Sequence, residues 1–600
     1  MLKLSLRIAV VVALTGCTAP TERTAEPTKQ PSTPDQSLST LLIRAEQTDE
    51  PTATEFRLAA AAQALDLGDA NQAQQVLALI SNPYAIASTS IDYLILAART
   101  AVKLGDAKST LSYLEDPRLQ STTLTVDQQI SIGRTRSDAY LQTRSFVASA
   151  RERIYLNRLI EESELLENHE QIFGSLIKVP ARSLTAQANK AITSDVRGWL
   201  SLAALTKMYQ NDPLRQLEEL NRWKRAWSHH PAARIPPRTL EMLSRVVTEQ
   251  PSIIALLLPL QGNLSPVGQA IRDGFIAAHY EQNGSAEIII YDTTTASAKE
   301  LVNRAKAQGV ELIIGPLSKK EVTDVASLDL DIPVLALNRS SDNSLNPNLF
   351  QFGLAPEDEI IQVTEQVHSE GLKHALVIYQ EGAWGSRNFL AFEHNWSKKG
   401  GTIVDTATFT NQRDFSDLVK GLLDIDSSEK RAADLRRIIG ERFEFTPRRR
   451  KDIDFVFLLT SNPGPARGIN PTLEHFYAED IPVYATSHIY ESSESWIDAI
   501  DLDGIRFCDI PWKLASFDTV QQQIQSTWSS AIGQLAPFYA VGLDAYRLYP
   551  RLQQLKELPD ETLFGATGSL RLNQNNVIER ELMWARFKDG KPVSTPMITQ

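Results

Sequence analysis

The sequence predicts a multidomain protein in which an all-α, helical-repeat region precedes a two-lobed α/β region. Three observations support this prediction. The chain has 600 residues, which is too long for a single domain of ordinary size. A Leu-Gly-Asp-Ala pattern recurs in its first half at a spacing of 37 residues. Its second half alternates short apolar runs with helical patterns, as parallel sheets covered by helices do.

The composition is that of a globular protein and narrows the possible functions. Hydrophobic residues make up 42% and charged residues 22% of the chain, which excludes a collagen-like or wholly disordered protein. With only two cysteines, Cys17 and Cys508, the chain cannot build a disulfide framework or a Cys-based zinc ribbon. The formal net charge of −12 gives no support to nucleic-acid binding.

Residues 1–16 have the features of an export signal. Lys3 and Arg7 precede the apolar run Ile8–Leu14, which is too short for the roughly twenty residues needed to cross a bilayer. The run ends in Leu-Thr-Gly before Cys17, and this end resembles a bacterial lipobox, in which the cysteine is acylated and becomes the N-terminus. We therefore expect a lipid on Cys17. Because Thr18 rather than Asp follows, the resemblance implies an outer-membrane lipoprotein that faces the periplasm.

After the anchor we expect a disordered tether that ends at residue 40. Residues 17–40 are rich in Pro, Thr and Ser and contain no aromatic side chain. Such a segment cannot bury enough apolar surface to offset the entropy lost on ordering. Partly extended, it could hold the folded part some tens of ångströms from a membrane, at about 3 Å per residue.

The next region, residues 41–248, is expected to be α-helical. The segment Ala64–Ala70 recurs as Ala101–Ala107, and a further shift of 37 residues leads to Asp138–Arg144. In each clear copy the Gly ends one helix in a left-handed cap and the Asp caps the next. The pattern resembles helix-hairpin repeats of the tetratricopeptide kind, with a plain helical bundle as the alternative. Stacked repeats of this kind present concave surfaces that bind proteins or peptides.

The pair His229-His230 near the end of this region suggests a metal site, but the suggestion is weak. Adjacent residues on a helix point about 100° apart, and no third ligand stands out. We therefore interpret the pair as a solvated helix end and predict no metal ligand.

Residues 251–600 are expected to form two doubly wound lobes. Ligands of such sheets bind beyond the carboxyl ends of the strands, so the space between the lobes is the place to look for a site. The expected strands of the first lobe are Ile253–Leu258, Glu287–Tyr291, Leu312–Ile314 and Ile332–Leu337. Those of the second are Ala375–Tyr379, Thr402–Phe409, Phe455–Leu459 and Val483–Ala485.

Five stretches of this region resemble the C-terminal domain of the LpoA family, outer-membrane lipoproteins that activate penicillin-binding protein 1A, a bifunctional peptidoglycan synthase. They are Ile254–Gly262, Ile271–Phe275, Ile314–Leu317, Phe350–Glu359 and Phe507–Trp512. The order of lipobox, tether, helical repeats and two-lobed domain agrees with that family over the whole chain. The resemblance implies a C-terminal domain similar to type I periplasmic binding proteins, which engages the synthase and raises its transpeptidase activity.

In similar periplasmic receptors, loops that follow the strands hold the ligand. Here those loops include Gln261, Gly262, Ser318 and Asn338, which are our candidate cleft residues. Ser318 also stands where it would cap the following helix, and we favour that role for it. No defined set of ligand-holding groups stands out, so the sequence identifies no small-molecule ligand.

A basic segment stands out within this acidic protein. Between Lys430 and Lys451 there are nine basic and three acidic residues, and the run Arg448-Arg449-Arg450 leads into the expected strand at Phe455. A solvated face opposite the acidic bulk would account for it. The alternative hypothesis is that Arg448, Arg449 and Arg450 contact the synthase.

Searches for catalytic patterns find no His-Glu-x-x-His, no Walker-type phosphate loop and no Gly-x-Ser-x-Gly elbow. The sequence therefore predicts no catalytic residue and no cofactor. We interpret the chain as a non-enzymatic regulator of peptidoglycan synthesis whose partner is penicillin-binding protein 1A. Two alternatives remain: a lipid-anchored receptor for an amino acid or a cell-wall fragment, and a peptidoglycan-active enzyme.

Overall fold

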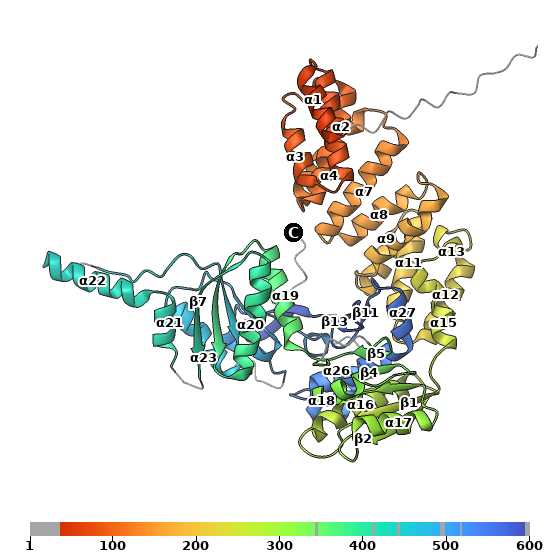
Figure 1. Cartoon of the computed structure of the whole chain (residues 1–600), viewed down its shortest axis with the longest axis vertical. Coiled ribbons are helices and arrows are strands. Elements are labelled where there is room, and N and C mark those ends of the chain that lie inside the picture. Colours follow the sequence, from red (N-terminus) through yellow and green to blue (C-terminus); the bar gives the residue numbers. More distant parts are fainter. Residues whose placement is uncertain are drawn as a thin grey trace, which may run out of the picture. The chain divides into compact units, whose positions relative to one another are not determined.

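The computed structural model describes residues 37–341, 346–410, 414–440, 444–492, 499–515 and 519–594 (Figure 1). The chain forms two compact units, Met1–Gln128 and Gln129–Gln600. Within these described ranges no helix is both long enough and apolar enough to span a bilayer. The expected signal peptide, Cys17 and residues 18–36 of the expected tether lie outside the described residues.

The first unit is helical, as predicted. Helix α1 begins at Leu38, so the last three residues of the expected tether are helical, with the Ser37 side chain capping the first turn. Buried alanine and leucine side chains form the core between the following helices. The helices are α1 (Leu38–Gln47), α2 (Thr52–Asp66), α3 (Ala70–Ala78), α4 (Ala87–Lys103), α5 (Ala107–Leu114), α6 (Pro117–Ser121) and the start of α7 (Val126–Gln142).

The repeated Gly-Asp pattern forms the turns of helical hairpins. Gly68 and Gly105 have φ angles of 85° and 83°, a left-handed conformation that glycine adopts without strain. Asp69 and Asp106 then cap α3 and α5 by accepting from backbone N–H groups at 2.8 and 2.9 Å. The third copy, between α7 and α8, turns at Arg144 with φ 57°, two residues later than a strict 37-residue shift gives. The predicted hairpin repeat is confirmed in these three turns.

The second unit continues with short helices around Trp199 and Trp223 before the α/β lobes begin. These helices are α8 (Phe146–Leu156), α9 (Leu165–Leu176), α10 (Ala181–Lys190), α11 (Ser194–Met208), α12 (Pro213–Ala226), α13 (Pro231–Arg234), α14 (Arg238–Glu241) and α15 (Leu243–Thr248). Single 3-10 turns in this unit are η1 (Glu162–Glu164), η2 (Ser487–Ile489), η3 (Ile500–Leu502), η4 (Ser529–Ala531) and η5 (Tyr549–Arg551).

His230 is not the solvated residue that we expected. It is only 5% exposed, and burial lowers the pKa of its imidazole. Its Nδ1 accepts from the Ala232 N–H at 3.2 Å and so caps α13, while Nε2 lies 2.9 Å from the Asp195 carbonyl. A Cβ on Gly198 would come within 2.4 Å of the ring, so the absence of a side chain there makes room for it. His229 is exposed, as predicted.

The helices of this unit share a buried polar interface with the α/β region. The Arg551 guanidinium donates to the Gln210 carbonyl at 2.7 Å and to Oε1 of Gln216 at 2.6 Å. Burial lowers its pKa to about 10. Nearby, the Lys207 ammonium lies 3.6 Å from the centre of the Phe564 ring. Because a buried arginine is stable only when its donors are paired, these contacts tie the two regions together.

Lobe I is built on a parallel sheet with the order β2-β1-β3-β4-β5. Helix α16 (Ser265–Glu281) and the late helix α26 (Ala536–Leu548) cover one face, and α17 (Ala298–Ala307) and α18 (Lys319–Ala326) cover the other. Glycines bring α16 and α26 close together, because a Cβ on Gly274 would lie 2.2 Å from the Tyr539 carbonyl oxygen. The strands are β1 (Ile253–Leu258), β2 (Glu287–Asp292), β3 (Leu312–Ile314), β4 (Val334–Ala336) and β5 (Leu349–Gln351).

Lobe II repeats this order and extends it, giving β15-β14-β10-β9-β8-β6-β7 with antiparallel β14 and β15 at one edge. Helices α19 (Pro356–Ser369) and α20 (Ala383–Lys398) cover one face. The other carries α21 (Ser416–Leu422), α23 (Gly464–His475) and the start of α22 (Ile425–Ile439). The strands are β6 (His374–Gln380), β7 (Thr402–Phe409), β8 (Phe455–Leu459), β9 (Val483–Ala485), β10 (Arg506–Asp509), β14 (Met583–Lys588) and β15 (Lys591–Ser594).

The chain passes between the lobes three times, after β5, after β10 and after β13. A small antiparallel sheet, β11-β12-β13, precedes the last passage. The fold class predicted from the sequence, helical repeats followed by a two-lobed α/β domain, is therefore confirmed. The remaining elements are α24 (Pro511–Leu514), α25 (Thr519–Thr527), α27 (Leu552–Glu557), β11 (Leu563–Phe564), β12 (Ser569–Leu572) and β13 (Ile578–Glu581).

Candidate functional site

The candidate cleft residues follow three neighbouring strands of lobe I. Gln261 and Gly262 follow β1, Ser318 follows β3, and Asn338 follows β4. Because β1, β3 and β4 are adjacent and parallel, these loops lie at the same edge of the sheet. The sequence therefore placed them correctly relative to the sheet.

The first loop is held by Asp292 at the end of β2. Its carboxylate accepts from the Gln261 side chain at 3.0 Å and from the Leu260 N–H at 3.0 Å. Burial opposes ionisation of Asp292, but these hydrogen bonds and those from Thr294 prevail and lower its pKa. Gly262 has φ 71° and its carbonyl accepts from the Ser265 N–H at 3.1 Å, which opens helix α16. The loop is therefore braced from within the lobe.

The other two side chains are engaged in the same way. Ser318 forms a capping box with Glu321, each side chain accepting from the backbone N–H of the other at 3.3 and 3.4 Å. The predicted capping role of Ser318 is thus confirmed. The Asn338 amide donates to the Leu317 carbonyl at 3.0 Å and accepts from the Arg339 N–H at 2.9 Å. Their hydrogen bonds fix the loops, and a ligand-holding role for these residues stays a prediction.

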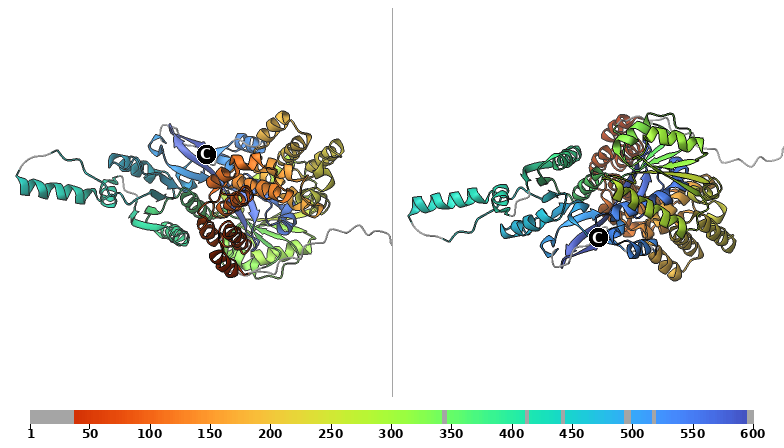
Figure 2. Two further views of the ribbon diagram at one scale, coloured as in Figure 1. Left: turned by 90° about the horizontal axis from the view of Figure 1, so that it is seen from above. Right: turned by 90° about the horizontal axis from the view of Figure 1, so that it is seen from below.

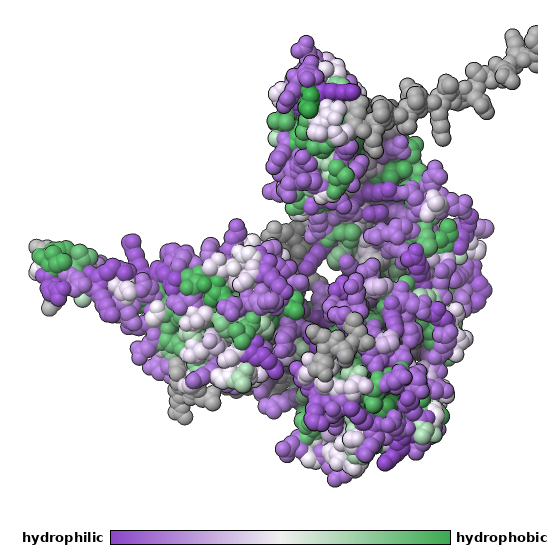
Figure 3. Space-filling view, in the orientation of Figure 1, coloured by the Kyte–Doolittle hydropathy of each residue, from purple (hydrophilic) through white to green (hydrophobic). Residues whose placement is uncertain are grey.

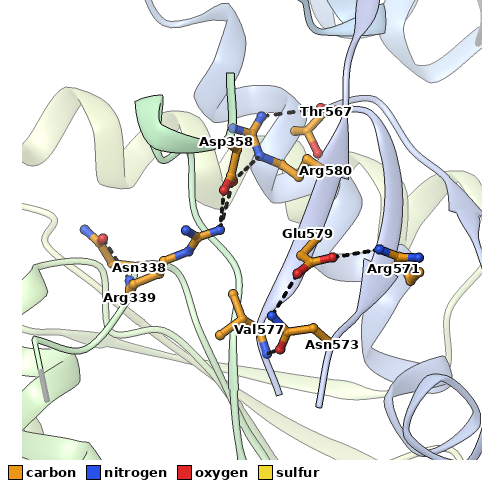
Figure 4. A network of polar contacts seen from close by, with 9 residues as sticks. All are labelled: Asn338, Arg339, Asp358, Thr567, Arg571, Asn573, Val577, Glu579 and Arg580. Atoms are coloured by element: carbon orange, nitrogen blue, oxygen red, sulfur yellow. Dashed lines mark hydrogen bonds and ion pairs between the residues drawn. The ribbon is translucent and has the colours of Figure 1, made fainter. Parts of the chain in front are cut away.

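A charged cluster lies where the chain leaves lobe I (Figure 4). Arg339 donates to both carboxylate oxygens of Asp358, in the first turn of α19, at 2.7 and 2.9 Å. On the other side, Nε of Arg580 on β13 lies 3.9 Å from the same carboxylate. The side chains of Asp358 and Arg580 are only 9% and 1% exposed. One carboxylate thus joins a lobe I loop, the first helix of lobe II and the small sheet.

Electrostatics make this cluster depend on all of its members. Burial raises the pKa of Asp358, and the two guanidinium groups oppose that shift. Removing either kind of charge would leave the other buried without a counter-ion. The neighbouring Glu359 binds lobe II instead, accepting from the Ser487 N–H and hydroxyl at 2.8 and 2.9 Å. Asp358 and Glu359, consecutive acids in the first turn of α19, therefore bind residues on opposite sides of the passage between the lobes.

Figure 4 also shows a second group of polar residues, which belongs to the small sheet. Glu579 on β13 accepts from Arg571 and from the Asn573 amide, both at 3.0 Å, and Asn573 also accepts from the Val577 N–H at 3.0 Å. Burial opposes ionisation of Glu579, but these donors outweigh it and lower its pKa. This group stabilises the hairpin that carries Arg580.

The second passage between the lobes also begins with a buried ion pair. Asp509, at the end of β10, lies 2.6 Å from the Lys513 ammonium, and both side chains are almost fully buried. Burial raises the pKa of Asp509 to about 6 even though Lys513 opposes the shift. The preceding residue, Cys508, is fully buried, and burial raises the pKa of its thiol well above the usual range. A buried thiol of this kind is a poor nucleophile.

These groups pair positively charged with negatively charged side chains. Within the described ranges, no three His, Cys, Asp or Glu residues gather as a metal site would require. The cluster at the passage pairs arginine with carboxylate, which fixes orientation and does not activate a nucleophile. Its arrangement fits a device that sets the position of one lobe against the other.

The basic run differs from what the sequence suggested. Arg449 is 8% exposed, and its guanidinium binds both Asp480 oxygens, at 2.5 and 2.6 Å, and the Tyr477 carbonyl. Arg450 pairs with Asp452 and Asp405. These two residues are therefore held in ion pairs and do not form a free basic surface, because Asp480, Asp452 and Asp405 neutralise them. Only Arg448 of the three has an exposed side chain, and its contact with a partner remains a prediction.

The cluster around Asp358 was not among the sequence predictions, although one signal for it was present. Three consecutive acids, Glu357-Asp358-Glu359, follow Pro356, a residue that is common in the first turn of a helix. Acids there favour a helix N-terminus, but exposed acids would serve equally well. The partners Arg339 and Arg580 lie far apart in the sequence, so nothing in the local pattern pointed to burial.

Comparison with known proteins supports one assignment. The family described as LppC putative lipoprotein matches residues 31–590. The penicillin-binding protein activator LpoA of Aliivibrio fischeri is 28% identical over 80% of this chain and 79% of its own length. The protein of the same name from Vibrio antiquarius is 26% identical over 96% and 97%. The solved structure of Haemophilus influenzae LpoA, 22% identical, shares the fold with a TM-score of 0.54 over 93% of this chain and 98% of that one. The resemblance drawn from the sequence is confirmed, and the chain belongs to the LppC lipoprotein family of LpoA-like proteins.

Proposed function

We propose that this protein is a non-enzymatic regulator of peptidoglycan synthesis. It is anchored in the outer membrane by a lipid on Cys17, binds penicillin-binding protein 1A through its C-terminal domain and stimulates the transpeptidase activity of that synthase. The observation that carries the proposal is the length of the match to relatives named penicillin-binding protein activators, which covers 96% of this chain in one case. Both helical and α/β regions are therefore part of the shared architecture.

The strand-end loops support a regulator over a nutrient receptor. Gln261, Ser318 and Asn338 each use their side chains to hold lobe I together. A receptor needs convergent polar groups that remain available to a ligand. The receptor alternative predicts saturable binding of an amino acid or a muropeptide in calorimetry, which the proposed function does not require.

The central experiment measures cross-linking by the cognate penicillin-binding protein 1A with and without the soluble chain that starts at Thr18. We expect the fraction of cross-linked muropeptides to rise when the chain is added. The chain alone should leave purified sacculi unchanged. Unaltered cross-linking by the synthase would overturn the proposed function, and turnover of sacculi by the chain alone would favour the enzyme alternative.

The whole soluble chain is needed for this test. A cut between residues 248 and 251 would remove Gln210 and Gln216 from the buried Arg551. Leaving a buried guanidinium without partners costs several kcal/mol, in the range of about 3–5 for a broken buried pair. A separate α/β domain could fail to bind merely because it is destabilised.

The anchor has its own test. Cys17→Ser removes the thiol that would be acylated. We expect the variant to lose incorporation of labelled fatty acid and to leave the membrane fraction. Label incorporation equal to that of the unaltered protein would overturn the assignment of Cys17.

A further inference from the structure

Helix α22 is an insertion in lobe II that projects from the body of the lobe. It lies in the connection 410–454 between β7 and β8, where lobe I has only residues 293–311 with the single helix α17. Figures 1 and 2 show α22 extending away from the strands of lobe II in every view. Residues 433–440 are all exposed. Among the residues that the structure describes, the outer part of α22 therefore packs against no core of this lobe.

An apolar stripe runs along this helix and continues past the point where the lobe covers it. Ile425, Ser428 and Ala432 are buried at the base. Leu435 and Ile439 continue the same stripe at helical spacing, and Ile438 lies beside them. Leu435 is 48% exposed, Ile439 is 56% exposed and Ile438 is 77% exposed. Figure 3 shows the hydrophobic colour gathered at the end of this projection.

Intrinsic helix stability does not explain an exposed apolar end of this kind. Isolated short helices are marginal in water, and the packing of an apolar face usually stabilises them. Clustered apolar side chains on a soluble protein commonly mark an interaction surface. The buried base joins the helix to the lobe, and its outer two turns are presented to the solvent.

The charges around this apolar end indicate what kind of surface it fits. The outer stretch of α22, residues 433–440, carries Arg436 and Arg437 against the single acid Asp434, which gives a local charge of +1 in a chain of −12. Arg437 pairs with Asp434 at 2.8 Å, and Arg436 lies over the Phe445 ring. A partner surface with an apolar centre and an acidic rim would complement this pattern.

The geometry favours a protein groove over a lipid surface. Leu435, Ile438 and Ile439 stand at positions i, i+3 and i+4, the anchor spacing of a helix that lies in a groove. An interfacial membrane helix instead lies flat along its length. That orientation is closed to α22, because the base of its apolar stripe, from Ile425 to Ala432, is buried in the lobe.

We propose that the outer two turns of α22 dock into an apolar, acid-rimmed groove of a partner protein. This proposal rests on the proposed function, because the partner is taken to be penicillin-binding protein 1A. Leu435, Ile438 and Ile439 fill the groove, and Arg436 and Arg437 face its acidic rim. The surface defined by these five residues is called the α22 tip.

The test compares binding of the soluble chain and its variants to cognate penicillin-binding protein 1A by surface plasmon resonance. Leu435→Asp, Ile438→Asp and Ile439→Asp are combined in one variant, which we expect to bind about tenfold or more weakly. Leu390→Asp is the matched control, because Leu390 is 59% exposed on α20 of the same lobe. All of these positions are exposed, so circular dichroism and thermal unfolding should match the unaltered chain.

Charge reversal supplies a second variant. Arg436→Glu with Arg437→Glu should slow association and weaken its dependence on salt, since steering by opposite charge is screened by ions. Lys398→Glu with Lys399→Glu is the control, because both lysines are exposed elsewhere on lobe II. Equal effects of the two reversals would show that only net charge matters and would overturn the rim assignment.

Each outcome separates the two proposals. Binding by the unaltered chain with no loss in the apolar variant overturns the α22 tip and leaves the proposed function intact. Absence of any binding by the unaltered chain overturns both. Binding to vesicles of phosphatidylglycerol that the apolar variant loses, with synthase binding kept, identifies lipid as the occupant and overturns the groove. Self-association in sedimentation that the variant loses, again with synthase binding kept, identifies a second copy instead.

Discussion

Lobe I and lobe II share one strand order but differ in what lies between the strands. In lobe I the sheet runs β2-β1-β3-β4-β5, and in lobe II the corresponding strands run β7-β6-β8-β9-β10. In lobe I the connection between the second and third strands contains one helix, whose Leu301, Val302 and Ala305 all pack on the sheet. In lobe II the same connection carries α21 and the projecting α22.

The comparison separates what the fold needs from what has been added to it. A ten-residue helix is enough to cover that part of the sheet in lobe I. Helix α21 and Ile425 at the start of α22 do the same in lobe II, while the outer half of α22, residues 433–440, is exposed. Lobe II is also extended by β14 and β15, which return from the small sheet and close its edge. Lobe II therefore has two additions. Strands β14 and β15 are structural, and the outer half of α22 faces outward.

The largest expected effect comes from separating the lobes at their shared cluster. Asp358→Ala leaves the buried Arg580 without its carboxylate, and we expect a loss of about 3–5 kcal/mol in the free energy of unfolding. Chemical denaturation followed by tryptophan fluorescence measures it. Glu357→Ala is the control, because Glu357 pairs with Arg387 at an exposed site where ion pairs contribute about 0–1 kcal/mol. Equal losses in both variants would show that burial of the cluster is not what matters.

A second effect depends on pH and concerns the passage that begins at Asp509. Its pKa is raised from 3.8 to about 6, so the folded state binds the proton more tightly than the unfolded state. The stability contributed by this group is therefore fully present below pH 3.8 and is lost as the pH rises through 6. At 1.36 kcal/mol per pKa unit, the loss amounts to about 3 kcal/mol.

Asp509→Asn removes this titration. As the pH rises from 4 to 8, we expect the free energy of unfolding of the variant to rise by up to about 3 kcal/mol relative to that of the unaltered chain. Denaturation at each pH measures this difference. Asp501→Asn, at an exposed site in the same lobe, provides the control. Parallel pH profiles for the Asp509 variant and the unaltered chain would contradict the assignment.

Helix packing offers an intermediate effect that distinguishes the lobes. Gly274→Ala in lobe I would place a Cβ 2.2 Å from the Tyr539 carbonyl oxygen, and we expect a loss of about 1–3 kcal/mol. Gly421→Ala in lobe II meets open space out to 4 Å among the described residues. It should be neutral or stabilising by about 0.5–1 kcal/mol, because alanine favours a helix over glycine. Thermal unfolding of both variants measures the difference, and similar shifts would refute the close contact of α16 with α26.

The smallest effect is expected at the outer end of α22. Ile439→Ala should change the free energy of unfolding by no more than about 0.5 kcal/mol, because the side chain is 56% exposed. Ile425→Ala at the buried base should cost about 2–5 kcal/mol, because it leaves a cavity. The two substitutions change the same residue type in one helix. A large loss at Ile439 would mean that the outer turns belong to the core.

The buried parallel strands were predictable, and the antiparallel additions were not. Leu312–Ile314, Thr402–Phe409 and Phe455–Leu459 begin and end where the sequence indicated. Each lies within a run in which apolar residues dominate, except for the alternating edge strand Thr402–Phe409. Strands such as β13 and β15 mix charged and apolar residues over four positions. So short a pattern cannot be told from a loop without knowledge of the neighbouring strand.

The ion-pair partners of the charged residues could not be predicted from the sequence. The sequence showed a block of basic residues, but the acids that neutralise Arg449 and Arg450 include Asp480 and Asp405, which stand dozens of positions away. The same limitation hid the pairing of Arg580 with Asp358. Local composition predicts where charge is abundant, whereas pairing depends on the tertiary fold. The Gly-Asp turns were predictable because their partners lie within the same few residues.

The burial of Cys508 has a practical consequence for studying the α22 tip in solution. In a soluble chain that starts at Thr18, Cys508 is the remaining cysteine, and it is fully enclosed with a thiol that resists ionisation. A new cysteine at an exposed position such as Ile438 would therefore react with maleimide dyes or spin labels far faster than Cys508 does. The native chain already provides the background for site-specific distance and mobility measurements, with no cysteine to remove first.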